Sequence, residues 1–200
     1  MLTRRKRGFT LIELLLVIAV MGVLLAVGLP QYAIWAQNLR VRGATEAVQN
    51  GLQMARATAL ARNTQAILVF RPNSLSYFVY TVPNPGTPPS DMQDPDADTP
   101  LLVDMVRRHN QADDAGGTTG TFYDDAGLPS LVTYMVTFSP LGSVVANPDG
   151  SARLSRIEIK SAAASPDPAI RKLEIRINAG GSTRTCDPQV TDPADLRKCP

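Results

Sequence analysis

The chain opens with four consecutive cations and a long apolar segment. Residues 4–7 read Arg-Arg-Lys-Arg, and residues 9–29 are apolar except for Thr10 and Glu13. This segment has the roughly 20 apolar residues that a helix needs to cross a bilayer. The cations before it should remain in the cytoplasm under the positive-inside rule, so the residues after Leu29 should lie on the far side of the membrane.

Helical periodicity continues beyond Pro30, as far as about Asn63. Small and apolar residues recur every three or four positions along one face, which predicts an amphipathic helix. They are Ala44, Val48, Leu52, Ala55 and Ala59. Pro30 should kink the helix, because proline removes a backbone donor and crowds the preceding turn. We therefore expect one long helix with a membrane half, residues 9–29, and an amphipathic half, residues 30–63.

Alternating and β-branched residues replace the helical pattern after residue 63. Residues 65–70 and 74–82 predict a hairpin that turns at residues 71–73. Further strands are expected at residues 101–107, 132–138, 152–159 and 172–177. Glycines make residues 116–120 a predicted flexible connector, and Asn147–Gly150 is predicted to be a hairpin turn. The pattern predicts an α+β fold, in which residues 64–200 form a β-rich head and its antiparallel sheet packs on the helix.

The segment from Pro83 to Pro100 is rich in proline and aspartate, so it is predicted to be a loop. Its acids invite comparison with a calcium site: Asp91, Asp94, Asp96 and Asp98. Their spacing lacks the glycine and the distal glutamate of an EF-hand loop, which favours a solvated loop over a calcium site.

Glu13 separates the possible interpretations of the apolar segment. A cleaved secretory signal has a shorter apolar core than this segment, and that core is followed by a cleavage site formed by small residues. A plain membrane anchor explains the length and the cations. It does not explain a carboxylate in the hydrocarbon, which costs about 2.5–3.5 kcal/mol and indicates a functional role.

A third interpretation comes from residues 7–13, Arg-Gly-Phe-Thr-Leu-Ile-Glu. They closely resemble the prepilin signature of type IV pilins and of type II secretion pseudopilins. The resemblance implies that a prepilin peptidase removes residues 1–8 by cutting between Gly8 and Phe9, and then N-methylates Phe9. It also makes Glu13 the assembly residue, because its carboxylate can be neutralised by the terminal amine of a neighbouring subunit when helices pack side by side. The fold implied is pilin-like.

Later segments resemble the FimT/GspH family of minor pilins and pseudopilins. The first similarity is at residues 137–142, Thr-Phe-Ser-Pro-Leu-Gly, followed by residues 147–151, Asn-Pro-Asp-Gly-Ser. The second is a late strand at residues 173–178 that runs into residues 180–186. Together these matches cover about half of the residues that follow the apolar segment.

In FimT-like proteins a Gly-Arg-x-Arg element near the C-terminus is implicated in DNA binding. This chain has Gly181-Ser182-Thr183-Arg184, which keeps the second arginine and has serine in place of the first. The resemblance therefore implies a site for double-stranded DNA that lacks one phosphate contact. The resemblance implies Gly181 and Arg184 as its residues, and Lys172 and Arg176 are added as candidates from the cations of the same C-terminal segment.

The charge balance excludes indiscriminate binding of nucleic acid. The chain has 20 Lys and Arg against 18 Asp and Glu, a net charge of +2. Four of the cations lie in residues 1–8, so the mature chain has 16 against 18, a net charge of −2 before its terminal amine is counted. From Ser151 onward nine cations face six acids. Such a segment can contact phosphates, although an ordinary solvated sheet edge is the simpler interpretation.

Cys186 and Cys199 are the only cysteines. An even pair delivered to an oxidising compartment predicts a disulfide that closes the C-terminal tail. Two cysteines and the single distant histidine, His109, supply too few ligands for zinc. His109 has no serine or cysteine motif around it, so we expect a surface residue. The sequence contains no phosphate-binding loop, paired catalytic carboxylates or nucleophile elbow, and we expect neither an enzyme nor a cofactor.

Two classes of function remain. The first is a FimT-like minor pilin that joins a type IV pilus near its tip, assists assembly and contacts DNA, or a GspH-like minor pseudopilin of type II secretion. This class implies the inner membrane with the head in the periplasm before assembly, and prepilin peptidase and other pilin subunits as partners. The second is a membrane-anchored periplasmic enzyme or binding domain with an uncleaved helix. Glu13 and the Gly8–Phe9 junction favour the first class, because an anchor needs neither.

Overall fold

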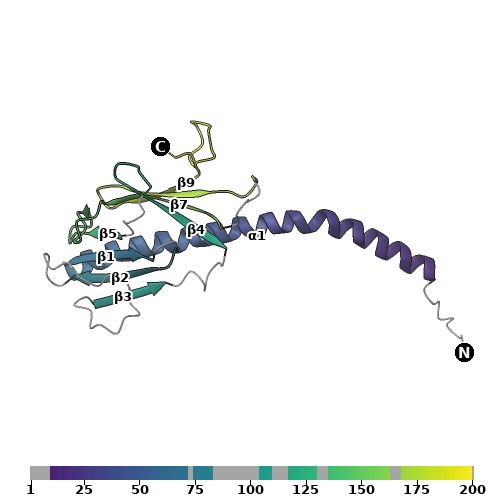
Figure 1. Cartoon of the computed structure of the whole chain (residues 1–200), viewed down its shortest axis with the longest axis horizontal. Coiled ribbons are helices and arrows are strands. Elements are labelled where there is room, and N and C mark those ends of the chain that lie inside the picture. Colours follow the sequence, from purple (N-terminus) through teal and green to yellow (C-terminus); the bar gives the residue numbers. More distant parts are fainter. Residues whose placement is uncertain are drawn as a thin grey trace, which may run out of the picture. The chain divides into compact units, whose positions relative to one another are not determined.

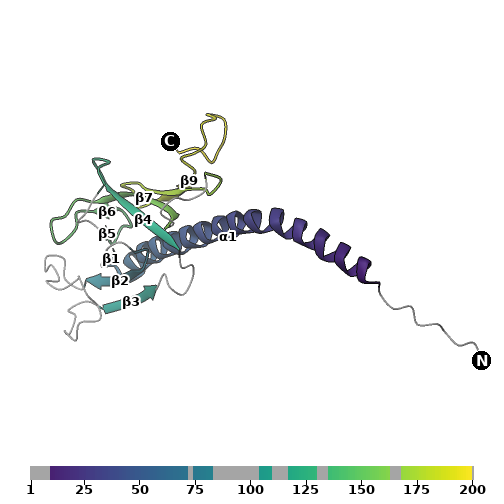
Figure 2. The ribbon, with the colours of Figure 1, turned by 45° about the vertical axis from the view of Figure 1, so that its right-hand side comes forward.

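The computed structural model describes residues 10–71, 74–82, 104–109, 117–129, 135–162 and 168–199. The chain divides into two compact units, Met1–Ala36 and Gln37–Pro200. Helix α1 begins in the first unit, and the strands belong to the second (Figures 1 and 2). The predicted leader, the Gly8–Phe9 junction and the aspartate-rich loop lie outside the described residues.

Helix α1, Leu11–Arg62, continues through Pro30. Its second half buries one face, which contains all five residues of the predicted stripe together with Val41, Thr45 and Gly51. Asn63 follows with a φ of 50°, the left-handed conformation that commonly ends a helix. The predicted amphipathic half of the helix is therefore confirmed.

Five strands form the first sheet, in the order β3-β2-β1-β5-β6. They are β1 Gln65–Phe70, β2 Tyr77–Val82, β3 Asp104–His109, β5 Met135–Phe138 and β6 Val144–Val145. All neighbouring strands are antiparallel. The predicted hairpin is confirmed, since β1 and β2 pair from Gln65 opposite Val82 to Phe70 opposite Tyr77.

Four further strands form a second antiparallel sheet, in the order β4-β7-β8-β9. They are β4 Thr118–Asp124, β7 Leu154–Ser161, β8 Leu173–Ile177 and β9 Thr183–Cys186. The predicted α+β fold, a long helix packed on antiparallel sheet, is confirmed, with the strands divided between two sheets. The predicted flexible connector at residues 116–120 is wrong for residues 118–120, which belong to β4. A Cβ on Gly120 would lie 2.6 Å from the Leu75 side chain, so this glycine permits close packing rather than flexibility.

The predicted turn at Asn147–Gly150 is present but does not close a hairpin. Gly150 N donates to the Asn147 carbonyl at 3.1 Å. β6 pairs within the first sheet and β7 within the second, so the turn carries the chain between sheets. The buried Asn147 amide fixes this crossing, because its Oδ1 accepts from Thr137 Oγ1 at 3.0 Å and its Nδ2 donates to the Ala152 carbonyl at 2.9 Å.

The buried face of α1 and both sheets share one hydrophobic core. Its members include Val48 and Leu52 of α1, Leu68 of β1, Phe138 of β5, Ile157 of β7 and Ile175 of β8. Gly51 brings the helix close to the first sheet, since a Cβ there would lie 2.4 Å from the Tyr77 ring. The alternate residues of β7 and β8 face outward, and this outer face of the second sheet carries the polar residues considered below.

Candidate functional site

Glu13 lies in the first turn of α1. Its backbone N–H donates to the Thr10 hydroxyl oxygen at 3.3 Å, and Thr10 directly precedes the helix. These two residues have the spacing of a capping box, and a carboxylate in the first turn also interacts favourably with the helix dipole. Glu13 can therefore stabilise the start of α1. Its assembly role stays a prediction.

The large apolar side chains in residues 11–29 of α1 are exposed. The large ones between Leu11 and Leu29 are 50% to 77% exposed. Soluble monomers rarely expose an apolar surface of this extent, so it indicates a lipid or protein partner. By length and composition, α1 is the one helix among the described residues that could cross a membrane.

The outer face of the second sheet carries a row of cations. Arg156 of β7, Arg176 of β8 and Arg184 of β9 lie opposite one another across the three strands. Tyr123 of β4 extends the row, and the Arg156 guanidinium lies 3.7 Å from its ring centroid. We call these four residues the arginine row. The sequence identified Arg176 and Arg184, whereas Arg156 and Tyr123 join them only through the strand register.

A buried carboxylate compensates part of this charge. Glu174 is 4% exposed, and its Oε1 accepts from Arg176 Nε at 2.6 Å. Arg156 Nη1 lies 4.0 Å from Glu174 Oε2. An unpaired buried carboxylate would be strongly destabilising, so Arg156 and Arg176 have a structural role. Arg184 is exposed and donates to the Leu196 carbonyl at 2.9 Å, and it has no carboxylate partner among the described residues.

Tyr123 provides a neutral hydroxyl at one end of the arginine row. Burial raises the pKa of its phenol, and the negative charge of Glu158 raises it further, while Arg156 lowers it. Because the net effect is an increase, the phenol stays protonated at neutral pH and can donate a hydrogen bond.

Gly181 has a packing role in the turn between β8 and β9. Its φ is 78°, and a Cβ there would lie 1.9 Å from the Gly142 carbonyl oxygen. Arg56 of α1 joins the same two turns, since its Nε donates to the Gly142 carbonyl at 3.0 Å and its Nη2 to the Gly180 carbonyl at 3.3 Å. The glycine is therefore explained by this close approach without any ligand.

Ser182 and Lys172 differ in how far along the chain they lie from the arginine row. Ser182 is exposed and lies directly before β9, two residues along the chain from Arg184. Lys172 directly precedes β8 and lies four residues from Arg176, about 13 Å along an extended strand. An arginine at position 182 would add a cation near the Arg184 end of the arginine row, whereas Lys172 is farther along the chain from Arg176.

Cys186 and Cys199 form the disulfide that the sequence predicted. Beside it, Asp187 N donates to the Arg197 carbonyl at 2.6 Å. A disulfide stabilises a fold mainly by restricting the unfolded chain, here around a loop with a sequence separation of 13. Glu174 lies close enough to both sulfurs for the three to share an ion, but the bonded cysteines have no free thiolate to ligate one.

Residues 3–29 match the family model of the prokaryotic N-terminal methylation motif. Two fimbrial proteins of Pseudomonas aeruginosa are each 31% identical to the chain over 74 residues, which are 37% of this chain and 47% of each relative. The chain thus spans about half the length of the curated relatives it matches. The N-terminal methylation motif that residues 7–13 predicted is therefore confirmed, and part of the chain is similar to fimbrial proteins.

Two crystal structures of the type IV minor pilin FimU of Pseudomonas aeruginosa are also similar. The first has a TM-score of 0.46 and 14% identity, over 79% of this chain and 99% of that chain. The second has a TM-score of 0.44 and 14% identity, over 76% and 99%. An apolar N-terminal helix behind a prepilin motif fits a membrane-anchored pilin that is later incorporated into a pilus.

Proposed function

We propose that the chain is a minor type IV pilin that is built into a filament through α1. The observation that carries the proposal is the methylation motif leading into a helix whose first half, residues 11–29, is apolar, exposed and contains one carboxylate, Glu13. Such helices can bury their apolar sides against one another, and Glu13 can then pair with the Phe9 amine of a neighbour. Prepilin peptidase and other pilin subunits are the partners in this scheme.

The proposal divides the chain by function. Residues 1–8 are the cleaved leader, residues 9–29 the membrane and assembly half of α1, residues 30–63 its amphipathic half, and residues 64–200 the head. The resemblance to FimT/GspH minor pilins supports a place near the filament tip, where the subunit would assist assembly. A GspH-like pseudopilin would use the same helix in a secretion filament.

Recovery of the chain in filaments sheared from cells tests this function. Recovery in purified pili supports the minor pilin, and recovery only in secretion pseudopili supports the GspH-like alternative. Complete retention in the membrane fraction would support an anchored enzyme or binding domain and contradict the proposal.

We further propose that the arginine row makes weak contacts with double-stranded DNA. Three arginines lie opposite one another in the strand register on one face of the sheet, and Arg184 has no carboxylate partner among the described residues. Guanidinium groups bind phosphates without reading base edges, so the contact should be independent of sequence and sensitive to salt. Glu174 weakens the contact with DNA because it compensates part of the arginine charge. Ser182 weakens it because an arginine at this position would add a phosphate contact.

The Arg184→Ala and Ser182→Arg variants should shift DNA affinity in opposite directions. Each changes the number of phosphate contacts by one, so the slope of log affinity against log salt should change by about 0.9 in each case. The measurement titrates the chain in nonionic detergent with labelled duplex at low and moderate salt. Arg153→Ala is the matched control, because Arg153 is exposed, pairs with Asp125 at 3.2 Å and lies off the row. If neither variant changes binding, the DNA proposal should be dropped in favour of a purely structural subunit.

A further inference from the structure

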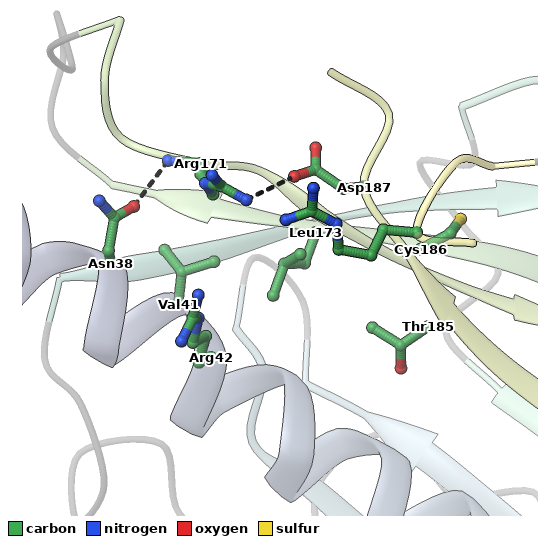
Figure 3. A pocket seen from close by; sticks show the side chains of 9 residues that line it. Asn38, Val41, Arg42, Arg171, Leu173, Thr185, Cys186 and Asp187 are labelled. Atoms are coloured by element: carbon green, nitrogen blue, oxygen red, sulfur yellow. Dashed lines mark hydrogen bonds and ion pairs between the residues drawn. The ribbon is translucent and has the colours of Figure 1, made fainter. Parts of the chain in front are cut away.

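A second basic site lies within the head, away from the outer face of the second sheet. A cavity of about 180 Å³ is bordered by α1, the start of β8, β9 and the C-terminal tail. Figure 3 shows Asn38, Val41 and Arg42 on α1 at one side, with Arg171, Leu173 and Asp187 across from them. Arg42, Arg171 and Arg197 line the cavity, together with apolar surface from Val41, Leu173 and Cys186.

Two of these arginines are held in place by existing contacts. The Arg171 backbone N–H donates to Asn38 Oδ1 at 2.8 Å, and its Nη1 donates to Asp187 Oδ2 at 3.4 Å. Arg197 Nη2 lies 2.7 Å from Asp195 Oδ2, and this pairing lowers the pKa of the Asp195 carboxyl to about 2. Because these guanidinium groups are already positioned, a ligand would lose little side-chain entropy in binding them.

Arg42 is left without a hydrogen-bond or ion-pair partner among the described residues. Among the described residues, Asp187 pairs with Arg171 and Asp195 pairs with Arg197, which leaves the charge of Arg42 as a surplus of one positive charge. A single carboxylate would balance it. The apolar surface beside the arginines also suits the short hydrocarbon stem of an aspartate or glutamate side chain, and a guanidinium fork matches a carboxylate geometrically.

We propose that this cavity receives one carboxylate side chain from a neighbouring subunit of the filament. The neighbour follows from the proposed function, in which subunits pack through α1, and Arg42 lies on that helix. The single surplus positive charge and the apolar surface of the cavity favour one acidic side chain as the partner over a polyanion.

Butyrate, a monocarboxylate with a short stem, probes the cavity directly. Added to the full chain in nonionic detergent, it should shift the amide NMR signals of Leu173 and Thr185, with an affinity at least tenfold weaker in Arg42→Gln. Arg40→Gln should bind butyrate as the parent does, because Arg40 is an exposed arginine of the same helix that does not line the cavity. No shift in the parent, or a shift with inorganic phosphate and none with butyrate, would overturn the proposal.

Filament incorporation gives the second arm of the test. Arg42→Gln should reduce the amount of chain in sheared filaments at least fivefold, and Arg40→Gln should leave it unchanged. Equal effects of the two variants would refute a specific role for the cavity, provided that both form the Cys186–Cys199 disulfide. If the parent chain itself is absent from filaments, the proposed function fails and the docking proposal falls with it, while bound butyrate would show only that the cavity takes carboxylates.

Discussion

Replacing Glu13 by alanine should remove the chain from filaments while leaving its processing and membrane insertion intact. In the proposed filament the Glu13 carboxylate is buried among apolar helices and pairs with a neighbour's terminal amine. Removing one partner of a buried pair costs about 3–5 kcal/mol, because the other charge is left uncompensated. This cost corresponds to a loss of more than about a hundredfold in the equilibrium constant for incorporation into the filament. In the membrane the alanine should be tolerated at least as well as the glutamate.

Glu13→Gln distinguishes the assembly role from the local role at the start of α1. Glutamine can complete a capping box with Thr10 as glutamate does, but it carries no charge. If pairing in the filament matters, both variants should disappear from sheared filaments while remaining in the membrane fraction, as immunoblots of the two fractions would show. Normal incorporation of Glu13→Gln beside loss of Glu13→Ala would assign Glu13 to helix capping alone. Normal incorporation of both would remove the assembly role.

Gly181→Ala should strongly destabilise the head. An alanine at a φ of 78° adopts the left-handed conformation at a cost of about 1–2 kcal/mol. Its Cβ would also lie 1.9 Å from the Gly142 carbonyl oxygen, so the two turns must separate. Their separation would break the hydrogen bonds from Arg56, and overpacking of this kind costs about a further 1–3 kcal/mol.

Gly150→Ala is the matched control for this prediction. Gly150 has a φ of 76°, but nothing lies within 4 Å of the position of its Cβ, so the variant bears only the conformational cost. Thermal unfolding followed by near-ultraviolet circular dichroism should show a clearly larger loss for Gly181→Ala than for Gly150→Ala. Equal losses would mean that the contact with Gly142 does not matter. A stable Gly181→Ala variant with weaker DNA binding would instead support a ligand role for the glycine.

Some parts of the fold could be predicted from the amino-acid sequence because they depend on local patterns. The stripe from Ala44 to Ala59 repeats with the helical period, and the β1–β2 hairpin joins two adjacent alternating segments. The prepilin signature lies within seven contiguous residues. In each case the determining residues are close together in the chain, so no knowledge of distant pairing was needed.

The remaining features depend on distant partners. The sequence did not predict β4, because the partner of this strand is distant: Thr118 pairs with Ser161, 43 residues away. The packing of Gly120 against Leu75 also leaves no pattern in the sequence. The arginine row exists only through the register of four strands. Gly181 was assigned to DNA binding through a resemblance, whereas its close contact is with Gly142 in another turn.

The N-terminus of the mature chain tests the central claim most directly. Intact-mass and N-terminal peptide analysis of the chain, purified from cells with an active prepilin peptidase, should show a start at Phe9 with one methyl group on its amine. Cells that lack the peptidase should retain residues 1–8. A chain that still begins at Met1 in the presence of the peptidase, or one that begins beyond Leu29, would contradict the assignment of this protein as a processed pilin subunit.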